Sequence, residues 1–212
     1  MDRIWLGSVF LVAYLIGSIS TAIIVGRFMA GDDIRSHGSG NAGATNALRT
    51  YGKKAAVFVV LGDCLKAVAA ILVGMIEAKV IGANAQTIQL AVYIAGVGAV
   101  LGHNFPLYFK FRGGKGILVS TVAILFADWK IGLAVIVFSI LIMAITRYVS
   151  LGSVLGSVAL VILGFIFHFG DTPYLIFAVI LAVSAIFMHR GNIKRLINGT
   201  ENKLGSKKNT GD

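Results

Sequence analysis

Residues 55–78 read AAVFVVLGDCLKAVAAILVGMIEA, and this stretch decides the fold. At a rise of about 1.5 Å per residue, a helix of this length crosses the ~30 Å hydrocarbon core of a bilayer. Apolar side chains fill most of its positions, and Asp63 and Lys66 interrupt them near the middle. The stretch therefore predicts a membrane-spanning helix.

Further apolar stretches on both sides of this helix repeat the pattern. The predicted spans are residues 4–25, 55–78, 87–101, 117–127, 131–145, 154–169 and 174–188. The stretch at 117–127 is too short to cross the core without support from its neighbours, so five or six spans are the alternative count. We expect an all-α polytopic membrane protein with about seven transmembrane helices, some of them short. It would form one domain over residues 1–212, with a polar cytoplasmic tail at 199–212.

The composition of the whole chain supports a membrane protein. Hydrophobic residues make up 57% and charged residues 13% of the 212 residues. Soluble domains carry about 25% charged residues, and a soluble globule of this size could not hide so much apolar surface. Cys64 is the only cysteine, which excludes an intrachain disulfide and a cysteine-built metal site.

The positive charges are concentrated on one side of the predicted spans. The net charge is +10, and an alternating seven-span topology places 15 of the 19 lysines and arginines on one side and 3 on the other. The positive-inside rule assigns the richer side to the cytoplasm. These residues flank membrane helices and lack interleaved aromatic residues, so they predict contacts with an anionic leaflet or a small anion and exclude nucleic acid.

Three polar segments on the cytoplasmic side are too rich in glycine, amide and basic groups to be simple turns. They read RSHGSGNAGATNALR at 35–49, GHNFPLYFKFRGGKG at 102–116 and HRGNIKRLINGTE at 189–201. Glycine lets backbone N–H groups approach an anion, and a helix N-terminus beside a lysine such as Lys115 can hold a phosphate. The GxGxxG spacing in the first segment is no dinucleotide fingerprint, because that segment joins two membrane helices and follows no strand.

Charged groups within the membrane are also functional candidates. Asp63 and Lys66 are spaced i, i+3 on one helix and can pair, whereas each would cost roughly 2.5 to 3.5 kcal/mol alone in the bilayer. We expect no metal site and no cofactor, since the four histidines are scattered and no HExxH motif occurs. His168 and Asp171 lie on the opposite side of the membrane and are expected to be structural.

The polar segments and DCLK at 63–66 resemble, in order and over nearly the whole chain, the motifs of the bacterial acyl-phosphate-dependent glycerol-3-phosphate acyltransferase family (PlsY). The resemblance implies catalytic roles for Ser39, Arg49, Lys115, His189 and Asn192. It implies substrate-binding roles for Asn41, Thr45, Asn46, Lys66, His103, Gly113, Gly114, Gly116, Ser150 and Ser153. It implies structural roles for Asp63 and Glu201.

The reaction that this resemblance implies moves a fatty acyl group from acyl phosphate to the sn-1 hydroxyl of glycerol 3-phosphate. The products are lysophosphatidic acid, a phospholipid precursor, and inorganic phosphate. The resemblance also implies a multi-pass protein of the bacterial cytoplasmic (inner) membrane whose site loops face the cytoplasm. The oligomeric state stays open, with a monomer as one expectation.

Other functions remain open at the level of sequence. A transporter for a phosphorylated metabolite would also need anion-binding loops and intramembrane charges, although transporters place their site near the membrane midplane. An acyltransferase with a different donor or acceptor, such as acyl-CoA or lysophosphatidate, is a further alternative, but no histidine here begins an HxxxxD motif. The proton acceptor is open as well, and is either a phosphate oxygen of the substrate or His189.

Overall fold

The computed structural model describes residues 4–205, and every regular element in that range is a helix. The elements are α1 (Trp5–Gly17), α2 (Thr21–Ala30), η1 (Ile34–Ser36), α3 (Ala44–Tyr51), α4 (Lys53–Val80), α5 (Ala85–Asn104), η2 (Leu107–Phe109), α6 (Ile117–Ala127), α7 (Trp129–Thr146), α8 (Val149–Phe167), α9 (Thr172–Met188) and α10 (Arg190–Ile197). The predicted all-α class is confirmed. The last seven residues of the predicted polar tail lie outside the described residues.

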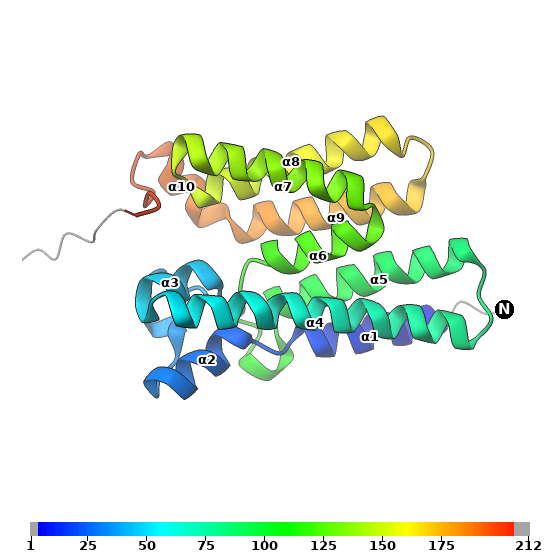
Figure 1. Ribbon diagram of the computed structural model, residues 1–212, viewed down its shortest axis with the longest axis horizontal. Coiled ribbons are helices and arrows are strands. Elements are labelled where there is room, and N and C mark those ends of the chain that lie inside the picture. Colours follow the sequence, from blue (N-terminus) through cyan, green and yellow to red (C-terminus); the bar gives the residue numbers. More distant parts are fainter. Residues whose placement is uncertain (1–3, 206–212) are drawn as a thin grey trace, which may run out of the picture.

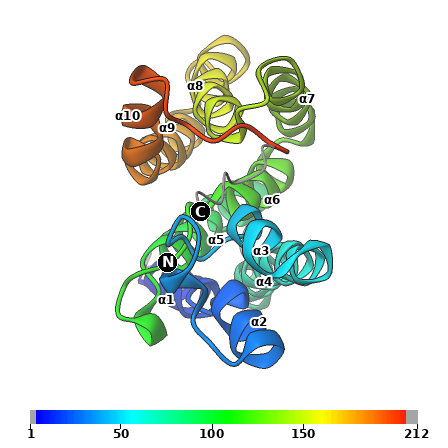
Figure 2. The same ribbon diagram turned by 90° about the vertical axis from the view of Figure 1, so that its left-hand side faces the viewer.

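The helices form two groups with the short α6 between them (Figure 1, Figure 2). One group contains α1 to α5, and the other contains α7 to α10. α6 packs against α4 and α5 in the first group and against α7 in the second. α3 and α10 lie at the same end of the molecule, which we call the polar end (Figure 1).

Most of the predicted spans are long enough to cross a bilayer. Within residues 4–205, the candidates are Trp5–Ala30, Lys53–Val80, Ala85–Phe109, Trp129–Thr146 and Val149–Phe167. α9 and α10 form a sixth candidate that bends by 60° where they meet. The seventh apolar segment is α6, which has only 11 residues, as the sequence predicts.

The first predicted span, residues 4–25, consists of two helices. The chain leaves helical geometry at Ser20, whose backbone is extended (φ −90°, ψ 95°). The break frees the carbonyl of Ile19, which accepts a hydrogen bond from Nζ of Lys66 (2.7 Å). Hydropathy alone does not reveal this break, because apolar residues lie on both sides of it.

α1 and α5 approach each other closely because glycines lie at their contact. A Cβ on Gly17 would lie 2.3 Å from the carbonyl oxygen of Ala99, and a Cβ on Gly102 would lie 2.2 Å from that of Tyr14. Small residues of this kind allow membrane helices to pack backbone against backbone. The contact fixes the end of α5, from which the second polar segment begins.

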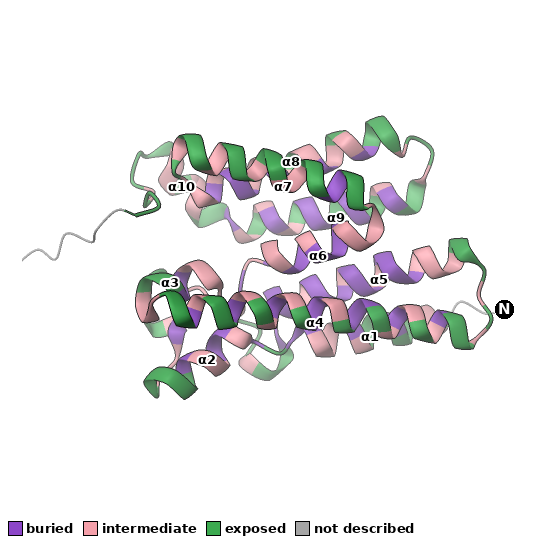
Figure 3. Cartoon of the chain, viewed as in Figure 1, coloured by how far each residue is buried: buried purple, intermediate pink, exposed green. Residues whose placement is uncertain are grey.

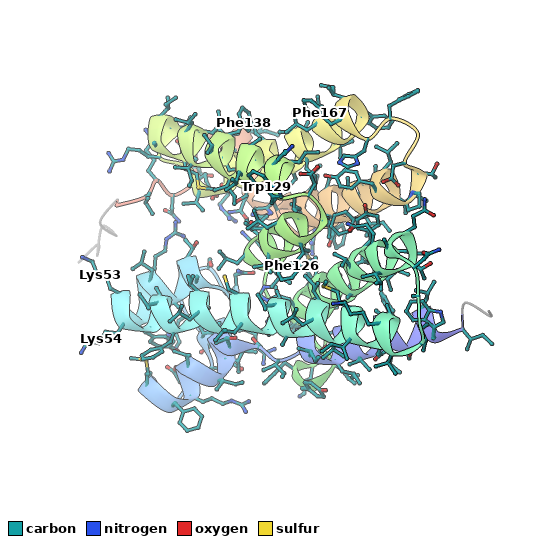
Figure 4. All side chains as sticks on the ribbon, turned by 45° about the vertical axis from the view of Figure 1, so that its right-hand side comes forward. Lys53, Lys54, Phe126, Trp129, Phe138 and Phe167 are labelled. Atoms are coloured by element: carbon teal, nitrogen blue, oxygen red, sulfur yellow. The ribbon has the colours of Figure 1, made fainter. Side chains whose placement is uncertain are left out.

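Many large hydrophobic side chains are exposed on the outside of the bundle, and Figure 3 shows exposed residues along the length of its outer helices. Phe138 on α7 and Phe167 on α8 are 39% and 69% exposed and lie on the outside of the second group (Figure 4). Lys53 and Lys54 begin α4 at the polar end (Figure 4). An apolar belt with basic residues at one end is typical of a protein embedded in a bilayer.

Candidate active site

The first polar segment is shaped by the side-chain amide of Asn46, a buried residue of α3. Its Nδ2 donates hydrogen bonds to the carbonyls of Ile34 (3.2 Å) and His37 (3.0 Å). Its Oδ1 accepts a hydrogen bond from the N–H of Ser39 (2.9 Å). Gly38 has φ +58°, and a Cβ there would lie 2.2 Å from the same Oδ1. Asn46 therefore fixes the backbone on which Ser39 stands.

Arg35 links the first polar segment to the second. Its Nη1 donates hydrogen bonds to the carbonyls of Phe109 (2.8 Å) and Arg112 (3.0 Å). Its Nη2 binds the carboxylate of Asp33 (2.7 Å), and this hydrogen bond holds the pKa of Asp33 below its usual range. The sequence does not predict this role of Arg35, because the two groups that it binds in the second polar segment are backbone carbonyls, which every residue has.

A cavity of about 540 Å³ lies beside this contact. It is lined by Asp33, Arg35, Ser36, Gly40, Lys110, Arg112 and Gly113. Its lining comes from both the first and the second polar segments, and three of its side chains are basic.

The second polar segment folds back on the end of α5. The N–H groups of Gly113 and Gly114 donate hydrogen bonds to carbonyls of the last two residues of α5 (3.2 and 3.1 Å). A Cβ on Gly114 would lie 2.1 Å from Nε2 of His103 and 2.7 Å from the carbonyl oxygen of Ala42. Gly116 has φ +75° and is the N-cap residue immediately before α6. These glycines allow the first two polar segments to touch.

Lys115 connects the second polar segment to the third. Its Nζ donates a hydrogen bond to Oδ1 of Asn192 on α10. Nδ2 of Asn192 in turn donates to Oε1 of Glu201 (2.6 Å). Glu201 also accepts hydrogen bonds from Oγ of Ser150 (2.8 Å) and Nε of Arg195 (2.7 Å). The structure thus brings four of the predicted site residues into one chain of hydrogen bonds.

Electrostatics at Lys115 favour an anion. Burial lowers the pKa of Lys115 to about 8, Glu201 opposes this shift, and the positive charges of Arg195 and Arg49 add to it. The guanidinium of Arg49 makes no hydrogen bond or ion pair with any residue between 4 and 205. The positive charges of Lys115 and Arg49 therefore lie close enough to act on the same bound anion. The N–H groups of Arg49 are available to donate hydrogen bonds to that anion.

His189 lies at the bend between α9 and α10 and is 3% exposed. Its Nδ1 is 2.8 Å from the carbonyl oxygen of Ala185, which can only accept a hydrogen bond. Nδ1 therefore carries a proton, and when the ring is neutral Nε2 is an acceptor. Within residues 4–205, no carboxylate contacts this ring.

The predicted pair inside the membrane is confirmed and has a third member. Nζ of Lys66 lies 2.9 Å from Oδ1 of Asp63 and 2.9 Å from Nδ1 of His103. The side chains of Asp63 and Lys66 are 3% and 5% exposed. This cluster links α4 to the end of α5, and its His103 ring packs against Gly114 of the second polar segment.

Three further predicted residues make fewer contacts. The hydroxyl of Ser153 donates to the carbonyl of Val149 within its own helix (2.9 Å). The side chains of Asn41, which precedes α3, and Thr45, in the first turn of α3, make no hydrogen bond within the described range. The described residues hold no group of three or more His, Cys, Asp or Glu side chains that could bind a metal ion.

Known proteins are similar in sequence to this chain. Residues 7–199 match the family profile described as "Glycerol-3-phosphate acyltransferase". The chain belongs to the glycerol-3-phosphate acyltransferase family. Family members with this name occur in Clostridioides difficile (strain 630), with 48% identity over 93% of this chain and 94% of the relative, and in Bacillus subtilis (strain 168), with 41% identity over 92% and 95%.

Solved structures of the glycerol-3-phosphate acyltransferase family share the fold as well. A crystal structure of PlsY (YgiH), described as an integral membrane glycerol 3-phosphate acyltransferase in its glycerol 3-phosphate form, matches with a TM-score of 0.83 and 31% identity over 95% of this chain and 96% of that one. The lysophosphatidic acid form matches with a TM-score of 0.80 and 29% identity, over the same shares. The family expected from the sequence motifs is confirmed.

Proposed function

We propose that this member of the glycerol-3-phosphate acyltransferase family moves a fatty acyl group from acyl phosphate to the sn-1 hydroxyl of glycerol 3-phosphate. The products would be lysophosphatidic acid and inorganic phosphate. The observation that carries the proposal is the convergence of Lys115, Arg49 and Asn192 at the polar end of an apolar bundle. Both substrates carry phosphate and the donor carries a long acyl chain, so the site needs cations beside lipid.

The cationic and backbone groups would bind the phosphates. The guanidinium of Arg49 can bind two phosphate oxygens at once, and Lys115 adds a point charge at the N-terminus of α6. Gly113, Gly114 and Gly116 keep the backbone close enough for this contact. Asn41, Thr45, Ser150 and Ser153 remain candidate contacts to the substrates.

The chemistry requires positioning more than a strong base. The sn-1 hydroxyl oxygen attacks the acyl carbonyl carbon, and the bond from that carbon to the phosphate oxygen breaks. The hydroxyl proton passes to a phosphate oxygen of the donor, which leaves as inorganic phosphate. Because an acyl phosphate is already an activated mixed anhydride, holding the two substrates together supplies much of the rate. Lys115 and Arg49 would stabilise the charge that develops.

We assign His189 to substrate positioning. Its Nδ1 proton is held by the carbonyl of Ala185, so Nε2 can accept a hydrogen bond from the glycerol moiety. A general base of the Ser-His-Asp type would have a carboxylate on that nitrogen. His103 and Lys66 contact each other, and Lys66 pairs with Asp63. We propose that this cluster holds the glycines of the second polar segment in place.

We further propose that the polar end faces the cytoplasm in the bacterial inner membrane and that the protein acts as a single-domain monomer. Of the 19 lysines and arginines, 15 fall on the side of this end in an alternating seven-span topology. Positive residues are retained on the cytoplasmic side. The soluble substrate glycerol 3-phosphate would then reach the site directly from the cytoplasm.

The test is a panel of donors given to the detergent-purified protein. Labelled glycerol 3-phosphate is supplied with palmitoyl phosphate, palmitoyl-CoA or palmitoyl carrier protein, and lysophosphatidic acid is measured. Product with palmitoyl phosphate alone supports the proposal. Product with palmitoyl-CoA would assign a different donor, and no product from folded protein, together with uptake of labelled substrate into proteoliposomes, would indicate a transporter.

A further inference from the structure

The residues after α10 turn back over the start of α8. α10 ends at Ile197, Gly199 follows with φ +68°, and the N–H of Thr200 donates a hydrogen bond to the carbonyl of Arg195 (2.8 Å). We call residues 200–205 the C-terminal strap. The family profile ends at residue 199, so the strap lies beyond the part of the chain that it covers.

The strap is fastened to the turn between α7 and α8 by Arg147. The N–H of Leu204 donates a hydrogen bond to the carbonyl of Arg147 (2.7 Å), and Nη2 of Arg147 donates one to the carbonyl of Leu204 (3.0 Å). We call this pair of bonds the clasp. Arg147 has φ +63°, a left-handed conformation that few non-glycine residues adopt. In addition, Nζ of Lys203 lies 5.5 Å from the ring centroid of Tyr148 in the same turn.

We infer that Arg147 is a positioning residue for the acyl transfer, because the clasp holds Glu201 in the site. Glu201 precedes Leu204 by three residues and accepts hydrogen bonds from Ser150, Asn192 and Arg195. Asn192 binds Lys115, so the clasp acts on the phosphate-binding lysine through two side chains. This inference rests on the proposed function of Lys115.

A second anchor is needed because residues 200–203 of the strap have no regular secondary structure to hold them. Ordering such a segment costs backbone conformational entropy for every residue that is fixed. Without the clasp, Glu201 could leave Asn192 and enter water, where its carboxylate is fully hydrated. Asn192 would then lose the acceptor that fixes its amide, and Oδ1 would no longer face Lys115.

Three variants separate the clasp from its surroundings. Leu204→Pro removes the N–H that donates to Arg147 and keeps an apolar side chain, whereas the matched control Leu204→Ala keeps the N–H. Arg147→Gly removes the guanidinium and adopts a positive φ without strain. We expect kcat/KM to fall about tenfold or more in Leu204→Pro and Arg147→Gly, and to stay within about twofold of wild type in Leu204→Ala.

The pH profile supplies a readout that a general loss of stability would not move. The charged groups that act on Lys115 are Glu201, Arg195 and Arg49, and Lys115 in turn acts on His189. Glu201 raises the pKa of Lys115, so displacing it should move the alkaline loss of activity to lower pH. The double variant Leu204→Pro/Glu201→Ala should be no worse than Glu201→Ala alone, since both changes break the same chain of contacts.

Two results would overturn the inference. The first is wild-type kcat/KM in both Leu204→Pro and Arg147→Gly. The second is a double variant Leu204→Pro/Glu201→Ala whose fold-loss in kcat/KM equals the product of the two single fold-losses, together with a pH profile that does not move in Leu204→Pro. The melting temperature in detergent shows whether each variant folds. If Leu204→Pro does not fold, the kcat/KM of Arg147→Gly tests the clasp instead. Glycerol 3-phosphate binding by calorimetry, expected to weaken at least fivefold in both variants, tests the clasp even if acyl phosphate is the wrong donor.

Discussion

Nζ of Lys115 donates a hydrogen bond to Oδ1 of Asn192, although 77 residues separate the two in the sequence. The bond joins the segment just before α6, a helix that packs against α4 and α5 of the first group, to α10 in the second group. Arg49 belongs to the first group and Glu201 to the end of the second. The phosphate-binding constellation is therefore complete only when the two groups are packed together, which links activity to tertiary packing within the bilayer.

The charge state of Lys115 predicts the alkaline limit of the enzyme. With a pKa of about 8, Lys115 is a cation below pH 8 and becomes neutral above it, so affinity for phosphate falls as the pH rises. Arginine stays charged at all these pH values. We expect KM for glycerol 3-phosphate to rise from pH 7.5 to 9.5 in the wild type and to rise much less in Lys115→Arg. Identical pH profiles for the two proteins would contradict this role of Lys115.

Arg49→Lys keeps the positive charge but loses the planar fork that binds two phosphate oxygens. A hydrogen bond to a charged group contributes about 1.5–3 kcal/mol, so losing the paired contact should lower kcat/KM roughly 100-fold. Steady-state kinetics with varied glycerol 3-phosphate checks this value. Wild-type kinetics in this variant would show that Arg49 does not clamp a phosphate.

Gly114→Ala tests the contact between the first two polar segments. The new Cβ would lie 2.1 Å from Nε2 of His103 and 2.7 Å from the carbonyl oxygen of Ala42, so one segment must move. We expect activity to fall at least about tenfold, with binding of glycerol 3-phosphate weakened in parallel. The matched control is Gly7→Ala on α1, where no atom lies within 4 Å of the new Cβ and activity should be unchanged.

The sequence predicts pairs that are close along one helix better than it predicts those that depend on packing. Asp63 and Lys66 pair as their i, i+3 spacing indicates. Their third contact, His103, depends on how α5 packs against α4, and the Ile19 carbonyl is available only because the first span breaks. Hydropathy shows neither feature, since both arise from glycine contacts and backbone geometry.

The three polar segments show the same division between what the sequence predicts and what packing decides. Family resemblance placed Lys115 and Asn192 in one site, but no spacing in the sequence predicts that they touch. No sequence pattern predicts the bridging role of Arg35, because its partners in the second polar segment are backbone carbonyls. The role of Arg147 likewise depends on the N–H and carbonyl of Leu204. Backbone groups do not depend on residue type, so the sequence does not indicate this contact.

Asp63→Asn tests the buried cluster. The variant leaves the ammonium of Lys66 without a charged partner, and removing one member of a buried ion pair costs about 3–5 kcal/mol. We expect a large drop in the melting temperature in detergent. The double variant Asp63→Asn/Lys66→Met removes both charges and should recover part of that loss. A double variant less stable than Asp63→Asn would indicate that Lys66 contributes through its bond to the Ile19 carbonyl instead.

His189→Gln separates the two hypotheses for proton transfer. Removing a general base typically lowers turnover roughly 100-fold or more. If a phosphate oxygen of the substrate takes the proton, as we propose, glutamine can still accept a hydrogen bond at this place, and kcat should stay above about a tenth of the wild-type value. A loss of 100-fold or more in folded His189→Gln protein that still binds glycerol 3-phosphate would assign the base to His189.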